Sequence, residues 1–179
     1  MKILKLYSLF ILFIAIGVSC QSEKPSEEKS DPIDSVFQAG DDTLFRGSNI
    51  GDSPDHVRNS EKSRIVEDSD TLLHYQSTYT FESGLSDVEV YYTFDEFGLF
   101  EIQVDFYPRN EEAPSKLMAQ LENYMTTRFG DPKELGTAKR WTTNSTTNSL
   151  VEITLSNESA DAEEPFVSLN FLEPLPDEI

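Results

Sequence analysis

Two hydrophobic periods alternate along the chain, and together they predict a mixed fold of strands and helices. From Leu72 onward, apolar side chains recur at every second residue, which is typical of a strand with one buried face and one exposed face. Alternation of this kind predicts six strands, at 72–81, 88–94, 100–106, 139–143, 150–156 and 166–172. Gly84 and Gly98 stand in the turns between the first three strands, which indicates an antiparallel meander.

Two other segments carry helix signals. Ser53 suits the N-cap position and Pro54 the first helical position, so a helix is expected at 54–61. A second helix is expected at 114–129, ended by Gly130. Its core stripe recurs at helical spacing and consists of Leu117, Leu121, Tyr124 and Met125.

The order of these elements is helix, three strands, helix, three strands. It predicts a two-layer α+β fold in which one antiparallel sheet of about six strands carries both helices on one face. The alternation places Asp105 on the exposed side of its strand. Most tyrosines fall in the core-facing register, but Tyr91 and Tyr107 do not. Because exposed aromatic side chains often anchor protein contacts, these two residues are the predicted partner contacts.

The N-terminal stretch has a different pattern. Lys2 and Lys5 precede thirteen almost entirely apolar residues, 6–18, which as a helix would span roughly 20 Å and fall short of a bilayer core of ~30 Å. This length suits the apolar region of a signal peptide. The expected organisation is a signal peptide at 1–19, a polar disordered tether at 20–35 and a single α+β domain at 36–175.

The end of the apolar stretch, Gly17-Val18-Ser19-Cys20, resembles the lipobox of bacterial lipoproteins. The resemblance implies that the chain is cleaved before Cys20, that fatty acids such as palmitate are attached to this residue, and that they anchor the protein in a membrane. Gln21, in a place where aspartate would retain a lipoprotein at the inner membrane, implies the outer membrane, on either its periplasmic or its surface side. An ordinary secretory signal and an uncleaved anchor remain the alternatives.

A second resemblance concerns the folded domain. Gly51-x-Ser53 leading to Val57, the glycine-turn meander, Tyr124, and the run at 128–132 together resemble small envelope proteins of the β-lactamase-inhibitor-like and SmpA-like type. The resemblance covers about residues 45–172. It implies a two-layer α+β domain that binds other proteins or assists outer-membrane assembly.

Charge and composition limit the chemistry. The net charge of −19 argues against nucleic acid as a partner. The sequence contains no nucleophile elbow, phosphate loop, zinc-binding helix motif or spaced cysteines, and neither His56 nor His74 has companions that suggest a metal site. Acidic loops at 67–70 and 161–164 leave weak calcium binding open. No cofactor, metal or catalytic residue is therefore expected.

These patterns favour a membrane-anchored envelope lipoprotein that presents a non-catalytic domain to another envelope protein. The first alternative is a lipoprotein that binds a small molecule, a glycan or a cation. A hydrolase based on a carboxylate pair is a more distant alternative, because 33 acidic residues place some carboxylates together by chance.

Overall fold

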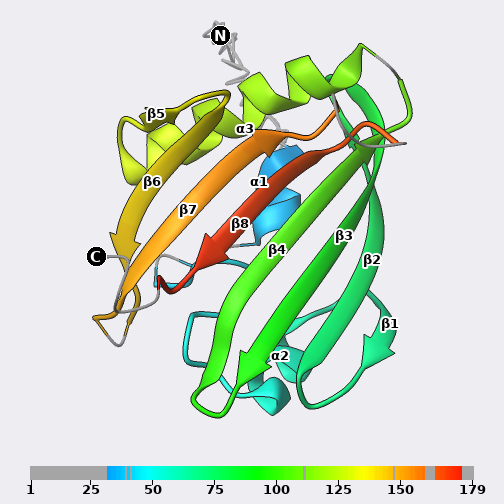
Figure 1. Ribbon diagram of the computed structural model, residues 1–179. Helices are drawn as coiled ribbons and strands as arrows, with labels where there is room; N and C mark the ends of the chain where they lie inside the picture. The colour runs from blue at the N-terminus through cyan, green and yellow to red at the C-terminus, as the bar shows by residue number, and fades with distance from the viewer. Residues whose placement is uncertain are drawn as a thin grey trace, which may run out of the picture.

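The computed structural model describes residues 32–38, 40, 42–110, 112–146, 148–159 and 164–174. The expected signal peptide, Cys20 and the tether up to residue 31 lie outside these residues. Within them, three helices and an antiparallel sheet of eight strands form an α+β fold (Figure 1). No helix of the described segments is long and apolar enough to cross a membrane.

The chain builds the sheet in two halves. The first half contains α1 (Pro32–Phe37), α2 (Pro54–Ser60), β1 (Arg64–Asp68), β2 (Leu72–Phe81), β3 (Gly84–Asp95) and β4 (Gly98–Pro108). The second contains α3 (Ala113–Phe129), β5 (Lys133–Leu135), β6 (Ala138–Asn144), β7 (Leu150–Asn157) and β8 (Val167–Leu172). Each half is a four-stranded meander, and the two join where β4 pairs with β8 to give the order β1-β2-β3-β4-β8-β7-β6-β5.

The prediction of an α+β fold with an antiparallel sheet is confirmed, but the expected six strands and two helices are wrong in number. The missed strands β1 and β5 are the two edges of the sheet, and every residue in both is exposed. An edge strand with no buried face needs no apolar alternation, and polar side chains at an edge discourage pairing with other chains. The missed helix α1 has only six residues, too few to show a helical period.

Helix α1 takes in residues 32–35, which the sequence analysis includes in the tether. Ile33, Val36 and Phe37 are buried there, so these residues belong to the packed domain and not to a tether. The ring of Phe37 stacks on that of Tyr124 from α3, with 4.4 Å between ring centroids. Two helices far apart in the sequence are thereby joined.

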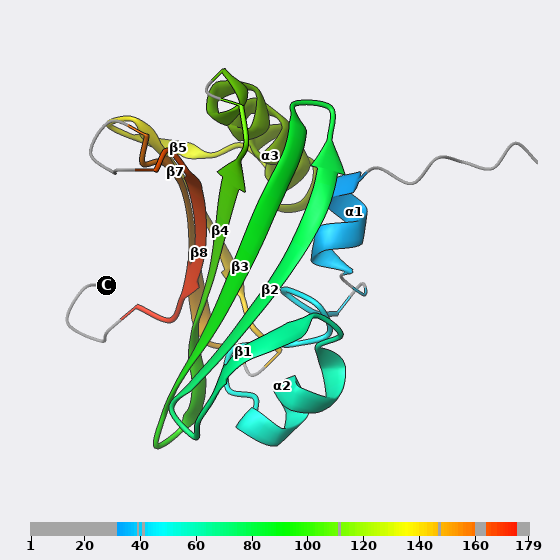
Figure 2. The ribbon, with the colours of Figure 1, turned by 90° about the vertical axis from the view of Figure 1, so that its right-hand side faces the viewer.

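The helices lie on one side of the sheet, and the core fills the space between the two layers (Figure 2). In α3, Leu117, Leu121 and Met125 are fully buried, as the helical spacing predicts, and α3 packs mainly on β7 and β6. The predicted cap of α2 is also present, because Ser53 Oγ accepts the N–H of His56.

A buried charged cluster ties the helical layer to the sheet. Arg46 and Glu61 form an ion pair of 2.9 Å, and each side chain is only 1% exposed. Arg46 also donates to the Tyr79 hydroxyl, and the Tyr92 hydroxyl donates to Glu61. Burial alone would raise the pKa of Glu61, but the charge and hydrogen bond of Arg46 outweigh it and hold this pKa below its ordinary value. We call these four residues the Arg46 cluster.

Candidate functional site

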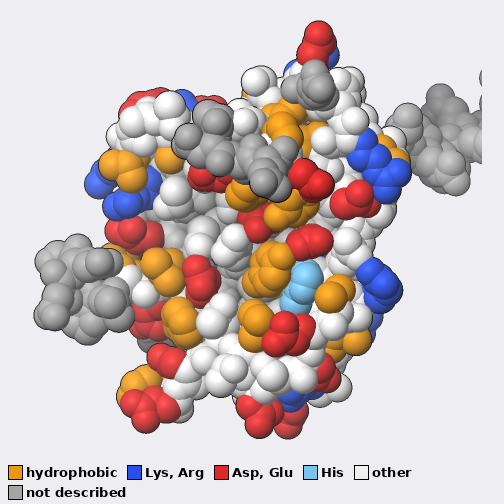
Figure 3. Space-filling model, turned by 45° about the vertical axis from the view of Figure 1, so that its right-hand side comes forward, with side chains coloured by type: hydrophobic (Ala, Val, Ile, Leu, Met, Phe, Trp, Pro, Cys, Tyr) orange, Lys and Arg blue, Asp and Glu red, His pale blue; other side chains and the backbone are white. Residues whose placement is uncertain are grey.

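The face of the sheet opposite the helices carries the side chains that alternation places on the outside. We call it the open face; acidic and hydrophobic side chains intermingle there around a histidine (Figure 3). Strand pairing aligns its residues in rows across the sheet. One row consists of Gln76, Glu89, Asp105, Ser168 and Ser156. The next row consists of His74, Tyr91, Gln103, Asn170, Thr154 and Arg140.

Asp105 lies near the middle of the open face. The expectation that it is exposed is wrong, since only 4% of its surface is accessible. Polar side chains cover it: Ser168 on the neighbouring strand β8 donates to Oδ1 at 2.7 Å, and Gln103, two residues earlier on β4, donates to Oδ2 at 2.8 Å. Burial raises the pKa of Asp105 and outweighs the hydrogen bonds from Ser168 and Gln103, and the charges of Glu89 and Glu158 raise it further.

Tyr91 belongs to a small polar cluster around Glu89. Its hydroxyl donates to Glu89, and the His74 ring stacks on its ring with 4.3 Å between centroids and 16° between planes. His74 Nε2 lies 3.4 Å from Glu89 Oε2. Burial, followed by the hydrogen bond to Glu89, raises the pKa of Tyr91. Tyr91 is therefore held in one orientation on the open face.

Tyr107 is held in a different way on the same face. Its ring stacks on Phe166, which immediately precedes β8, with 5.3 Å between centroids. Burial, followed by the charges of Asp105 and Glu89, raises the pKa of Tyr107 to about 12. The row that contains Glu89 and Asp105 passes between the positions of Tyr91 and Tyr107. The structure thus brings the two predicted contact residues to one surface, with the buried Asp105 and the half-buried Glu89 between them.

A hollow of about 450 Å³ adjoins these residues over β7 and β8. Its lining is mostly polar, and Phe166 is its one aromatic residue. Arg140 Nη1 lies 3.2 Å from Glu152 Oε2. Arg140 Nε and Asn170 Oδ1 are buried atoms without a hydrogen-bond partner among the described residues, so this hollow holds polar groups available to a ligand.

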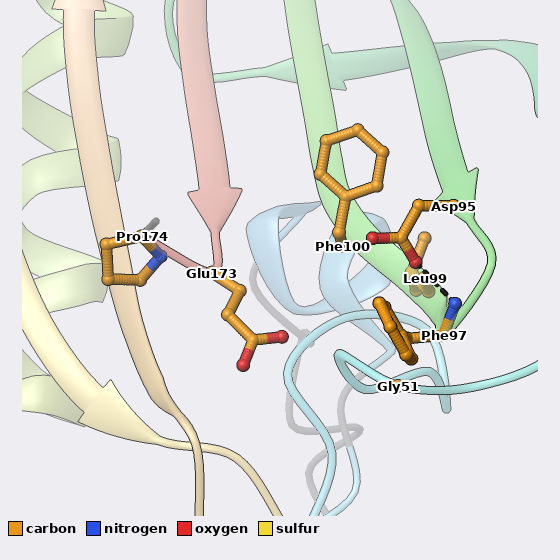
Figure 4. Close-up of a pocket in the computed structure, with 7 residues that line it drawn as sticks. All are labelled: Gly51, Asp95, Phe97, Leu99, Phe100, Glu173 and Pro174. Carbon is orange, nitrogen blue, oxygen red and sulfur yellow. Dashed lines mark hydrogen bonds between the residues drawn. The ribbon is translucent and has the colours of Figure 1, made fainter. Parts of the chain in front are cut away.

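A second cavity, of about 480 Å³, lies at the end of the sheet that the β3–β4 turn closes (Figure 4). Its lining residues are Gly51, Asp95, Phe97, Leu99, Phe100, Glu173 and Pro174. Phe97 in the turn is 82% exposed. We call this cavity the Phe97 groove.

Of the remaining predicted chemical groups, those that the structure describes line neither cavity. His56 Nε2 lies 3.0 Å from the carbonyl oxygen of Gly47. In the acidic loop at 67–70, the Arg58 guanidinium pairs with Asp68 at 2.8 Å and lies 3.6 Å from Asp70. Of the acidic loop at 161–164, only Glu164 is among the described residues. In the described segments, no group of three or more His, Cys, Asp or Glu side chains is arranged to hold a metal ion.

Sequence reasoning missed three residues that shape these surfaces. The predicted strand at 166–172 includes Phe166, but in the structure this residue lies just before β8 and its ring packs on Tyr107. Asp105 was placed on the correct face, but nothing in its local pattern shows that neighbouring strands cover it. The sequence does indicate that Phe97 is exposed, because it stands in a four-residue acidic turn from which its side chain cannot reach the core.

Comparison with known proteins gives no relative: no protein-family model, no curated protein and no solved structure matches this chain.

Proposed function

We propose that this protein is a lipid-anchored envelope protein that binds another envelope protein through the open face and performs no catalysis. The observation that carries the proposal is the placement of Tyr91 and Tyr107 on one helix-free surface, with the half-buried Glu89 and the buried Asp105 between them. The anchor rests on the lipobox-like sequence that ends at Cys20.

The two tyrosines have the properties of contact anchors. Each is partly buried, and each is fixed by a stacked ring, His74 for Tyr91 and Phe166 for Tyr107. A preorganised aromatic side chain loses little conformational entropy when a partner covers it, which favours binding. Acidic groups surround the pair, so a partner surface with basic and apolar side chains fits best.

The contact can be tested by capture from detergent-solubilised envelopes with the tagged full chain. Replacing Tyr91 and Tyr107 together by lysine should abolish capture of a specific partner, because it removes both rings and reverses the local charge. A matched control places two lysines at Ser115 and Asn123, which are exposed on α3 on the opposite side of the molecule. Equal recovery of the same proteins by the tyrosine variant and the control would reject the proposal.

The anchor needs its own test. Growth with a clickable palmitate analogue should label the wild-type protein and leave a Cys20→Ala variant unlabelled. Equal labelling of the two, or no label on the wild type, would reject the lipid anchor while leaving the contact surface untouched.

A second candidate function is supported by the polar hollow over β7 and β8. Unpartnered Arg140 Nε and Asn170 Oδ1, together with the ring of Phe166, are groups that could bind a neutral polar ligand such as a sugar. A panel of neutral mono- and disaccharides should then raise the melting temperature of the wild type, and Asn170→Leu should remove the rise. Absence of any shift across the panel would eliminate this candidate.

A further inference from the structure

The Phe97 groove is formed by a turn that holds an aromatic ring in solvent. Phe97 is the most exposed of the large hydrophobic side chains in the described part of the chain. Asp95 Oδ1 accepts the N–H groups of Phe97 at 2.8 Å and of Gly98 at 3.1 Å. The exposed position of the ring is therefore set by a hydrogen-bonded turn.

Backbone contacts with the loop before α2 fix the base of this turn. Gly98 has a φ of +125°, and a Cβ built there would lie 2.6 Å from the carbonyl oxygen of Gly51. The N–H of Gly51 donates to Leu99 O at 2.7 Å, and the N–H of Leu99 donates to Asp52 O at 2.8 Å. The loop before α2 thus holds the turn in place, and glycine is required where the two backbones meet.

The cavity beside the ring is largely apolar. Phe97, Phe100 and Leu99 line it from the β3–β4 side, and Pro174 lines it from the chain that leaves β8 (Figure 4). Its volume of about 480 Å³ lies within the range typical of ligand pockets and is ample for a large apolar side chain.

The charged groups at the groove all have one sign. Asp95 and Glu173 line it, Glu96 is exposed in the same turn, and none of the lining residues is Lys or Arg. An occupant with positive charges beside its apolar side chain would gain from these carboxylates. A second copy of this chain would instead bring its own acidic turn against them.

From these observations we propose that the Phe97 groove binds a basic protein segment, inserting one large apolar side chain between Phe97 and Pro174 while flanking Lys or Arg side chains meet Asp95 and Glu173. The C-terminal residues 175–179 directly follow Pro174 but carry Asp177 and Glu178, so their charge does not fit this rim. The groove is separate from Tyr91 and Tyr107, and the inference does not depend on the proposed contact through the open face.

Titration calorimetry of the full chain with two capped hexapeptides tests the inference. Lys-Lys-Leu-Phe-Lys-Lys should bind, and Glu-Glu-Leu-Phe-Glu-Glu should not. Phe97→Ala should weaken binding of the basic peptide at least tenfold, and Glu173→Gln should weaken it several-fold with a smaller salt dependence. Leu135→Ala is the matched control, because it removes a half-exposed apolar side chain on β5 and should leave binding unchanged.

Four results would overturn the inference. The first is equal affinity of the wild type and Phe97→Ala, and the second is equal binding of the basic and acidic peptides. The third is a chain ending at Pro174 that binds at least tenfold more tightly than the full chain, which would assign the groove to residues 175–179. The fourth is dimerisation of the free protein that Phe97→Ala abolishes. The Tyr91 and Tyr107 double variant should bind the peptide like the wild type, so failure here and failure of the open-face contact are distinguishable.

Discussion

Two buried carboxylates on opposite faces of the same sheet differ in the partners that surround them. Beneath the helices, Glu61 pairs with Arg46 at 2.9 Å, and its pKa lies below the ordinary value. On the open face, Asp105 receives hydrogen bonds from the neutral groups of Ser168 and Gln103, and its pKa lies above the ordinary value. Burial acts in the same direction on both, so the neighbouring charge decides the outcome.

The difference separates a structural cluster from a candidate binding surface. The Arg46 cluster satisfies its charges internally and joins the helical layer to β2 and β3. On the open face, no Lys or Arg of the described residues forms an ion pair with Asp105 or Glu89, and a basic partner would relieve the cost of keeping these two carboxylates close together. Four measurements of stability test this difference between the two faces of the sheet.

The largest effect is expected for Glu61→Gln. It removes the negative charge opposite Arg46 and leaves a cation buried without an ionic partner, which should lower the free energy of unfolding by about 3–5 kcal/mol. Urea denaturation followed by circular dichroism measures the loss. An apolar pair, Arg46→Met with Glu61→Leu, should cost less than Glu61→Gln, and a loss below 1 kcal/mol for Glu61→Gln would show that the ion pair does not stabilise the fold.

A smaller effect of opposite sign is expected for Asp105→Asn. The amide can keep contacts with Ser168 and Gln103 while removing a buried charge, so the free energy of unfolding at pH 7 should rise by about 0.5–1.5 kcal/mol. Urea denaturation under the same conditions measures it. Destabilisation instead would mean that the charged form of Asp105 is favoured in the folded protein.

The pH dependence of these two effects should differ in cause and in range. The pKa of Glu61 is lowered on folding, so its stabilisation is present above the ordinary pKa of 4.5 and is lost as pH falls through the folded value. The pKa of Asp105 is raised, so its cost is absent below the ordinary value of 3.8 and appears as pH rises through the folded value. Denaturation at a series of pH values should therefore show the Asp105→Asn difference fading as pH falls toward 3.8, and the Glu61→Gln difference fading only as pH falls below 4.5.

The smallest effect is expected for an exposed pair on the open face. Arg109 lies 3.1 Å from Asp87, and this hydrogen-bonded contact lowers the pKa of Asp87. Because solvent screens the pair, Arg109→Ala should lower the free energy of unfolding by no more than about 0.2–1 kcal/mol, and 1 M salt should reduce the loss further. A loss comparable to that of Glu61→Gln would contradict the distinction between buried and exposed pairs.

The sequence predicted the strands that have one buried face and one exposed face. Strands with one buried face, such as β3 with Val88, Val90 and Tyr92, show a period of two. The fully exposed edge strands β1 and β5 show no such period in the sequence. They form by pairing with the neighbouring strand and have no buried face of their own.

The candidate surfaces were predictable to different degrees. The register that identifies Tyr91 and Tyr107 as outward-facing is local, so the sequence placed both on the correct side. The burial of Asp105 depends on Ser168, which is 63 positions away in the chain. The Phe97 groove likewise combines the β3–β4 turn with residues after β8. Contacts between such distant segments follow from the order of the strands in the sheet, which local periodicity does not encode.

The strand order also determines when the sheet can be finished during synthesis. β8 comes last in chain order among the described strands, yet it occupies an interior position between β4 and β7. Until it arrives, each half of the domain presents an unsatisfied edge, and the two halves have no strand contact with each other. A chain that lacks Val167–Leu172 would thus hold two separate meanders and not a slightly shortened sheet, because the sheet becomes continuous only when β8 pairs with β4 and β7.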